Sequence, residues 1–242
     1  VRVVFVLLPG VVGALFAPER PVLVYVTPPG WLGTRLEEVI RTAVAAAEGG
    51  AAAVQLRDEG TPLLLLCEAT RAIASACPVI VNNGDMGVAM SCGASGFHFK
   101  ERDIDEANVR RARRSFDVVG ASAHSVDAAL RAVQLGVDYV QLGTMFPTRT
   151  HPEKRTLEGP TLVADVRRHL SLPPGGTGTG TGTGPLLLGV GGIDPSNCAD
   201  VVRAGADGVA IIRAIALADD SARVSKTIRA TMADCDCGAP RA

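Results

Sequence analysis

Two adjacent glycines in the last quarter of the chain carry the clearest chemical signal. Gly191 and Gly192 follow the apolar run Leu186–Val190. Glycine lets main-chain N–H groups come close to an anion. Ile212 and Arg213 follow the next apolar run, where a short helix would add the positive end of its dipole. We therefore predict a phosphate-binding site at these four residues, with a simple tight turn at the glycine pair as the alternative.

Two polar side chains alternate with apolar residues in the segment Val54–Arg57. Gln55 and Arg57 therefore lie on one face of an extended chain. A guanidinium group binds phosphate or carboxylate through paired hydrogen bonds, so we predict that Arg57, together with Gln55, binds substrate. An ion pair between Arg57 and Asp58 or Glu59 is the structural alternative.

Three further residues at the ends of apolar runs are candidates for the site. An unperturbed imidazole titrates near neutral pH, so His124 is a candidate general acid or base, and Ser122 is a candidate substrate ligand. A place next to a helix cap, without catalysis, is the alternative for His124. Asn83 either orients a polar heterocycle or forms an Asn-Gly turn. His98 is either a packed core histidine or a ligand.

The segment after residues 139–143 is polar and rich in cationic or titratable groups. It contains Thr148, Thr150 and His151, and it is long enough to fold over a bound anion. We predict that these three side chains bind substrate. A solvated loop is the alternative.

These residues stand at the ends of apolar runs that are each followed by a segment of helical length. The pattern predicts strands at residues 22–26, 53–57, 79–82, 96–99, 118–122, 139–143, 186–190 and 208–212. It predicts helices at residues 36–48, 63–76, 85–92, 105–115, 126–135, 161–170, 195–204 and 221–232. Alternating strands and helices of this number favour the α/β class and a single (β/α)8 TIM barrel, whose chemistry lies where the strands end. An open doubly wound sheet is the alternative, but the Thr-Pro-Pro-Gly after the first strand is no dinucleotide fingerprint.

The barrel domain is expected to span residues 21–232. Residues 1–20 form an apolar N-terminal extension that is too short and too interrupted to cross a membrane. Gly and Thr alternate in residues 175–184, which we interpret as a flexible insertion, and residues 233–242 as a polar tail. The cysteines contain no C-x-x-C pair, as expected of reduced thiols in a cytoplasmic protein.

The composition argues against several classes of partner. Lys and Arg number 24 against 25 Asp and Glu, whereas a nucleic-acid-binding protein would show a basic excess. Six Phe, two Tyr and one Trp leave little for base stacking. We therefore expect a small-molecule substrate, no nucleic acid and no membrane, and the sequence leaves a homo-oligomer open.

An ordered set of segments links the chain to a known family. The segments are VQLRDE from Val54, VNNGD from Val81, GFHF from Gly96, ASAHS from Ala121, YVQLGTMFPTRTHP from Tyr139, LGVGGI from Leu188 and GADGVAIIRAI from Gly205. Together they resemble the thiamine phosphate synthase/TenI superfamily of (β/α)8 barrels. The resemblance runs from about Val22 to Leu217, and the order of the segments makes it specific.

The resemblance implies one of two enzymes. A thiamine phosphate synthase joins hydroxymethylpyrimidine pyrophosphate to a thiazole phosphate, releases pyrophosphate and uses Mg²⁺ held by two aspartates. A TenI-type protein is a tautomerase that acts on a thiazole phosphate carboxylate and needs no metal. The residues that match the thiazole-phosphate side common to both are Gly191, Gly192, Ile212, Thr148 and Thr150. Arg213 stands where a small serine is usual, and it either aids or blocks anion binding.

The pyrophosphate side departs from the synthase pattern. Glu59 replaces a lysine, and either Gly84 or Asn83 replaces one of the two metal-binding aspartates, depending on the alignment. Asp103 matches the second aspartate, and Asp85 is close enough in sequence to substitute for the first. His151 stands where another lysine is usual. The exchange of lysine for glutamate changes the local charge by two units, which disfavours the expulsion of a polyanion.

We therefore predict a TenI-like thiazole tautomerase without a cofactor, in which His124 moves the proton and Arg57 holds the substrate carboxylate. The first alternative is a thiamine phosphate synthase that binds Mg²⁺ through Asp85 and Asp103, with Lys154 in place of the lost lysine. The second alternative is a non-catalytic protein that binds a phosphorylated ligand.

Overall fold

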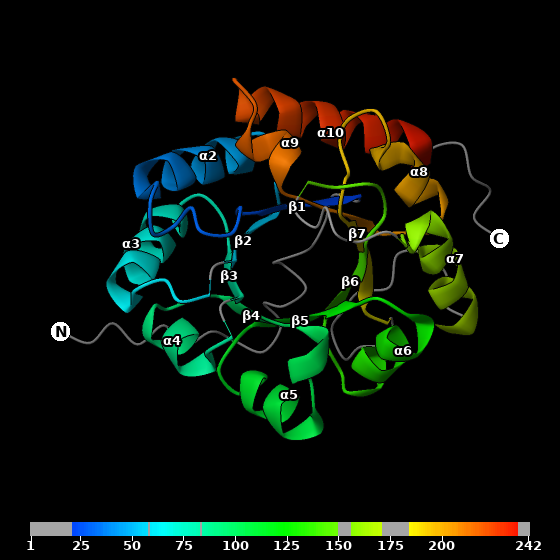
Figure 1. Cartoon of the computed structure of the whole chain (residues 1–242), viewed down its shortest axis with the longest axis horizontal. Coiled ribbons are helices and arrows are strands. Elements are labelled where there is room, and N and C mark those ends of the chain that lie inside the picture. The colour runs from blue at the N-terminus through cyan, green and yellow to red at the C-terminus, as the bar shows by residue number, and fades with distance from the viewer. Residues whose placement is uncertain (1–20, 58, 83, 150–155, 171–183, 237–242) are drawn as a thin grey trace.

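The short apolar runs form the strands of a closed parallel barrel in the computed structural model (Figure 1). The structure describes residues 21–57, 59–82, 84–149, 156–170 and 184–236. The strands are β1 Val22–Val26, β2 Ala53–Arg57, β3 Val79–Asn82, β4 Gly96–Phe99, β5 Val118–Ala123, β6 Tyr139–Gly143, β7 Leu186–Val190 and β8 Gly208–Ile211. Each strand pairs with the next, and β8 pairs with β1. The predicted (β/α)8 barrel is therefore confirmed.

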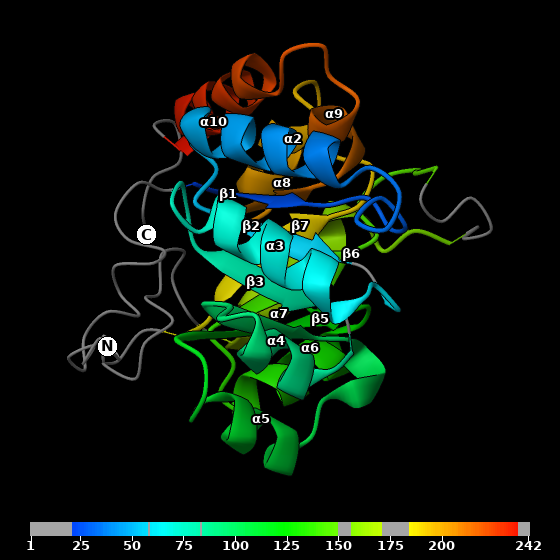
Figure 2. The same ribbon diagram turned by 90° about the vertical axis from the view of Figure 1, so that its left-hand side faces the viewer.

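Helices cover the outside of the barrel (Figure 2). They are α2 Leu36–Glu48, α3 Leu63–Ile73, α4 Met86–Ser91, α5 Glu106–Ala112, α6 Val126–Gln134, α7 Gly159–Leu170, α8 Cys198–Arg203, α9 Arg213–Ala216 and α10 Ser221–Asp236, with a 3₁₀ turn, η1, at Glu101–Asp103. Helix α10 packs against α2 and α8 outside β1. None of the helices in the described part of the chain is long and apolar enough to span a membrane.

Side-chain hydrogen bonds explain why α8 begins later than the pattern predicts. Asp194 Oδ1 accepts hydrogen bonds from the main-chain N and the Oγ of Ser196 at 2.7 and 2.6 Å. The main-chain N of Asp194 donates to Asn197 Oδ1 at 2.9 Å. These bonds hold residues 194–197 in a turn, so the helix starts only at Cys198. At the other end of the chain, α10 continues to Asp236, so residues 233–236 of the predicted tail are helical.

The strands are buried on both faces because alternate side chains pack on opposite sides. One buried cluster contains strand residues alone and fills the barrel interior: Val22, Val24, Val26, Ala53, Ile80, Val118, Tyr139, Leu186, Leu188 and Ala210. The other cluster combines the opposite strand faces with residues of the surrounding helices, such as Leu66 and Val163. Burial on both faces accounts for the continuous apolar runs in the sequence.

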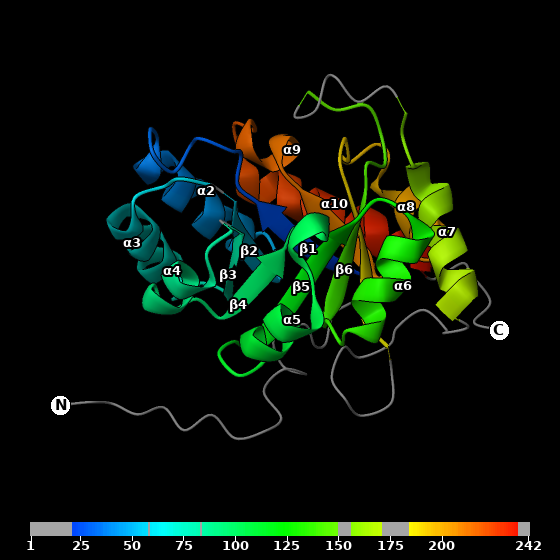
Figure 3. The same ribbon diagram turned by 60° about the horizontal axis from the view of Figure 1, so that its bottom comes forward.

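Toward the carboxyl ends of the strands the interior positions become polar. The inward alternation continues from Ala53 to Gln55 and Arg57, and from Ile80 to Asn82. Figure 3 shows β6 leading into the described part of its connection to α7, which extends beyond the strand ends. The predicted N-terminal extension, residues 1–20, and residues 175–183 of the predicted insertion lie outside the described residues.

Candidate active site

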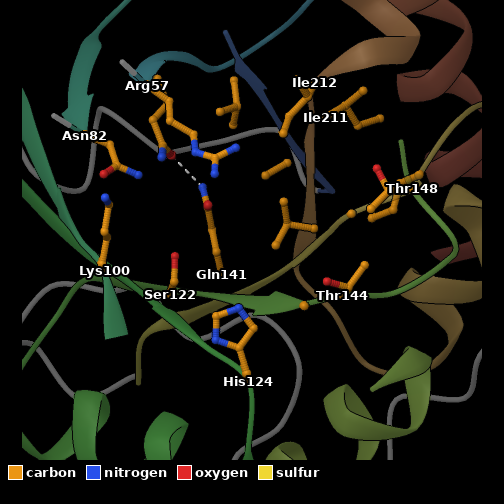
Figure 4. A pocket seen from close by; sticks show the side chains of 18 of the residues that line it. Arg57, Asn82, Lys100, Ser122, His124, Gln141, Thr144, Thr148, Ile211 and Ile212 are labelled. Carbon is orange, nitrogen blue, oxygen red and sulfur yellow. Dashed lines mark hydrogen bonds between the residues drawn. The ribbon is translucent and has the colours of Figure 1, made fainter. Parts of the chain in front are cut away.

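The carboxyl ends of the strands surround a cavity of about 1140 Å³ (Figure 4). This is the end of a (β/α)8 barrel at which catalytic residues are found. The predicted site residues that line it are Gln55, Arg57, Ser122, His124, Thr148, Gly191, Gly192, Ile212 and Arg213. Asn83, Thr150 and His151 lie outside the described residues.

The glycine turn after β7 is shaped by its backbone and by its neighbours. The φ angles of Gly191 and Gly192 are +99° and +66°, values that favour glycine. A Cβ atom on Gly191 would lie 2.6 Å from Thr144 Cγ2, and one on Gly192 would lie 2.5 Å from the carbonyl oxygens of Phe146 and Pro147. The turn therefore packs directly on the segment that follows β6.

Hydrogen bonds fix this contact. The main-chain N of Phe146 donates to the carbonyl oxygen of Gly191 at 3.0 Å. Asn197 Nδ2 donates to the carbonyl oxygen of Gly192, also at 3.0 Å. The predicted short helix after β8 is present as α9, which begins at Arg213. Arg213 is exposed and lines the cavity at its margin, so its side chain does not fill the interior.

Three cationic side chains line the cavity on the opposite side of the barrel. Arg57 ends β2, Lys100 follows β4, and Arg102 lies in η1. The carboxylate of Glu59 contacts Lys100 Nζ, and one of its oxygens lies 3.8 Å from an Nη of Arg102. Burial and the guanidinium groups of Arg102 and Arg57 lower the pKa of Lys100, whereas Asp103 raises it. Sequence reasoning missed Lys100, although it continues the inward alternation of Gly96 and His98.

A buried polar layer lies beneath the cavity. Gln141 Nε2 donates to Gln55 Oε1 at 2.6 Å, and both residues are almost fully buried while lining the cavity floor. Asn82 is 5% exposed and lines the cavity beside Arg57, its partner in the β2–β3 register. Within the described residues, Asn82 Oδ1 is buried without a hydrogen-bond partner.

His98 belongs to the core, the first of its two predicted alternatives. Its Nδ1 lies 2.8 Å from the Tyr139 hydroxyl, and its Nε2 lies 2.8 Å from Ser122 Oγ. Burial, with a smaller contribution from Arg57, lowers the pKa of His98 to about 3, so the ring is neutral at pH 7. A neutral imidazole has one N–H, so it donates to one neighbour and accepts from the other.

His124 lies at the cavity margin next to a carboxylate. Its main-chain N and its Nδ1 each lie 2.7 Å from the same oxygen of Glu101. The side chain is about half exposed. Glu101 therefore orients the imidazole, an arrangement suited to proton transfer.

The predicted pair of magnesium ligands is not assembled at the cavity. Asp85 Oδ1 accepts hydrogen bonds from the main-chain N atoms of Gly87 and Val88 and caps α4. Asp103 lies 3.5 Å from Arg102 Nε. Neither aspartate lines the cavity, and the described residues contain no group of three or more His, Cys, Asp or Glu side chains that could hold a metal ion. The assignment of Asp85 and Asp103 as magnesium ligands therefore stays a prediction of the synthase alternative.

The closed (β/α)8 barrel places this protein in the TIM-barrel class. Its polar cavity lies at the carboxyl ends of the strands, where TIM-barrel proteins have their active sites. The particular family follows from comparison with known proteins. The family model described as thiamine monophosphate synthase matches residues 23–215, and the chain belongs to this family.

Curated relatives and solved structures agree with this assignment. The chain is 33% identical over 191 residues to the thiamine-phosphate synthase of Chloroflexus aurantiacus, covering 77% of this chain and 82% of that protein. It is 36% identical over 202 residues to the thiamine-phosphate synthase of Roseiflexus castenholzii, covering 81% and 80%. The thiamine phosphate pyrophosphorylase of Pyrococcus furiosus has the same fold, with a TM-score of 0.69 at 23% identity over 89% of this chain and 97% of that one.

Proposed function

We propose that this chain is a thiamine phosphate synthase, which joins hydroxymethylpyrimidine pyrophosphate to a thiazole phosphate and releases pyrophosphate. The observation that carries the proposal is the presence of two candidate anion sites on opposite sides of one cavity. Arg57 ends β2, Lys100 and Arg102 follow β4, and the glycine turn follows β7. A coupling of two phosphorylated substrates requires both sides, and the relatives described above carry this enzyme's name.

The largest change in charge during the reaction occurs on the leaving pyrophosphate, next to Arg57, Lys100 and Arg102. The thiazole nitrogen forms a bond to the methylene carbon of the pyrimidine, and the bond from that carbon to the pyrophosphate oxygen breaks. The electron pair of the broken bond leaves on the pyrophosphate. Preorganised cations next to the leaving group stabilise this developing charge. We assign to Arg57, Lys100 and Arg102 the stabilisation of the negative charge on the leaving pyrophosphate.

The remaining cavity residues would hold the two rings in reacting positions. The main chain at Gly191 and Gly192 is assigned to the thiazole phosphate. The Gln55–Gln141 hydrogen bond leaves the amide nitrogen of Gln55 and the carbonyl of Gln141 for polar atoms of the pyrimidine. Fixing both reactants in one cavity converts the coupling into an effectively unimolecular step.

Magnesium stays a prediction of the synthase assignment. When bound, Mg²⁺ supplies neutralisation of pyrophosphate oxygens. Because Asp85 caps a helix and Asp103 pairs with Arg102, no step is assigned to these two residues through the metal.

The tautomerase that the sequence analysis favoured is the second candidate. The observation in its favour is the pair of His124 and Glu101 at the cavity margin, which can move a proton without a metal. The relatives support the synthase more strongly, because those at 33–36% identity are named for that activity.

Two assays distinguish these candidates. The purified protein is incubated with both thiamine precursors, and separately with the thiazole phosphate carboxylate tautomer alone. We expect thiamine phosphate in the first assay and no isomerisation above background in the second. Isomerisation that His124→Ala abolishes, without any coupling, would establish the tautomerase instead. Binding of thiazole phosphate with neither reaction would establish a non-catalytic binding protein.

A further inference from the structure

Lys100 is placed to contact an anion in the cavity. It follows β4 at the next inward position after Gly96 and His98, and it lines the cavity. Its side chain is 26% exposed, so most of it is removed from solvent. Figure 4 shows Lys100 and Asn82 on one side of the cavity and Thr148 and Ile212 on the other.

The carboxylate in contact with Lys100 comes from a different strand end. Glu59 lies just beyond β2, in a turn, and its side chain is 55% exposed. It does not line the cavity. A Cβ atom on Gly84 would lie 3.6 Å from Glu59 Oε1, so Glu59 approaches the turn after β3 as well. An exposed carboxylate on a turn can exchange its ion pair for water at little cost.

Three cationic side chains, Arg57, Lys100 and Arg102, converge on this side of the cavity. The carboxylates of Glu59 and Asp103 lie next to them, and Glu101 lines the cavity with them. Burial and the two guanidinium groups lower the pKa of Lys100, which means that the charged ammonium is disfavoured where it lies. A multiply charged anion in the cavity would reverse this effect, because it attracts all three cations at once.

The position of Lys100 changes how the glutamate at position 59 is interpreted. The family resemblance implies a lysine at position 59, and its replacement suggested that the pyrophosphate side had lost a cation. The contact between Glu59 and Lys100 puts a lysine beside that position from the end of β4. An ammonium group is therefore present beside position 59, and Glu59 neutralises it in the free protein.

We infer that Lys100 binds the diphosphate group of the pyrimidine substrate, and that Glu59 is its counter-ion in the free protein and is displaced when the diphosphate binds. The inference deepens the proposed function and rests on it for the identity of the substrate. The chemistry that it assigns is a contact between a diphosphate and a lysine ammonium.

Calorimetric titration with inorganic pyrophosphate in the presence of Mg²⁺ tests the role of Lys100. Lys100→Met keeps an unbranched side chain that is one atom shorter and removes its charge, and we expect at least a tenfold loss of pyrophosphate affinity. Lys226→Met is the matched control, because Lys226 is exposed on α10 and does not line the cavity. An affinity of Lys100→Met within twofold of the control would overturn the inference.

Glu59→Gln tests the role of the counter-ion. It removes the charge that competes with pyrophosphate for Lys100, so we expect affinity to rise severalfold. A loss of affinity would show that Glu59 helps to hold the ligand and would overturn its assignment as a displaced counter-ion. Circular dichroism of each variant identifies any loss of fold.

The binding experiment is independent of turnover. If the wild-type protein forms no thiamine phosphate but Lys100→Met loses pyrophosphate affinity, the proposed function fails and the diphosphate contact stands. If the wild-type protein forms thiamine phosphate and Lys100→Met binds pyrophosphate as well as the control, the proposed function stands and the inference about Lys100 fails.

Discussion

Nε2 of His98 lies 2.8 Å from Oγ of Ser122, and this hydrogen bond connects the barrel core to the cavity. His98 is 1% exposed, whereas Ser122 lines the cavity. The Tyr139 hydroxyl holds the other ring nitrogen. The buried ring therefore fixes the position of a hydroxyl group that faces the cavity, and it does so as a neutral imidazole.

Neutral burial of His98 makes the stability of the protein depend on pH. The pKa of His98 falls from 6.5 to about 3 on folding. Between these values the unfolded chain binds a proton that the folded chain does not, so this contribution is complete above about pH 6.5 and decreases as the pH falls toward 3. At pH 5 the loss is about 2 kcal/mol of the free energy of unfolding.

Denaturant unfolding of the wild type and His98→Gln at pH 8 and pH 5 measures this effect. The variant is expected to be less stable at pH 8 but to lose about 2 kcal/mol less than the wild type between the two pH values. Equal losses in the two proteins would contradict a neutral, buried His98.

Ser122 should contribute to the rate of coupling. Ser122→Ala removes a hydroxyl that the His98 ring orients toward the cavity, and we expect kcat to fall about 10²-fold with a smaller change in KM. Ser125→Ala is the control, since Ser125 caps α6 and does not line the cavity. That variant should lose about 1 kcal/mol of stability and keep its kcat. Unchanged kcat in Ser122→Ala would remove this residue from the active site.

The strands were predictable because of their burial. Helices outside and side chains inside make each strand continuously apolar, so each run has recognisable ends in the sequence. Site residues directly at those ends, such as Gln55, Arg57 and Ser122, were predicted for the same reason. The contact between His98, Tyr139 and Ser122 was not predictable, because it joins three strands whose register is decided by closure of the barrel.

The structural roles of Lys100 and Asp85 were not predicted from the sequence. Lys100 was missed because its role is indicated only by its inward position and its contact with Glu59. That contact joins the ends of β2 and β4, which are far apart in the sequence. Asp85 was predicted as a metal ligand from its place near the missing aspartate, and the structure shows that its side chain caps α4. An aspartate just before a helix is a common cap, so the local pattern already contained this second interpretation.

Gly120 should tolerate no side chain. A Cβ atom there would lie 2.1 Å from the Tyr139 ring, which is fully buried and bonded to His98. We expect Gly120→Ala to lower the free energy of unfolding by about 1–3 kcal/mol or more, because the ring has no free space to enter. Gly33→Ala serves as the control, because a Cβ atom on Gly33 meets nothing within 4 Å. Equal thermal midpoints for the two variants would contradict this packing.

The glycine turn should be needed for binding of the thiazole phosphate. A Cβ atom on Gly192 would lie 2.5 Å from two carbonyl oxygens of the β6–α7 connection, so Gly192→Ala must displace that segment. We expect at least a tenfold loss of affinity for thiazole phosphate in calorimetric titration. Gly136→Ala controls for backbone strain, because Gly136 also has a positive φ, of +84°, but has open space around it and does not line the cavity. Comparable affinities in the two variants would argue that the turn is only structural.

The most direct test of the account is the stoichiometry of the coupling reaction. The wild-type protein is incubated with hydroxymethylpyrimidine pyrophosphate and thiazole phosphate in the presence of Mg²⁺, and thiamine phosphate and pyrophosphate are measured together over time. We expect the two products to form in equal amounts and only when both substrates are present. Pyrophosphate release without thiamine phosphate, or no turnover by protein that binds both substrates, would contradict the assignment as a synthase.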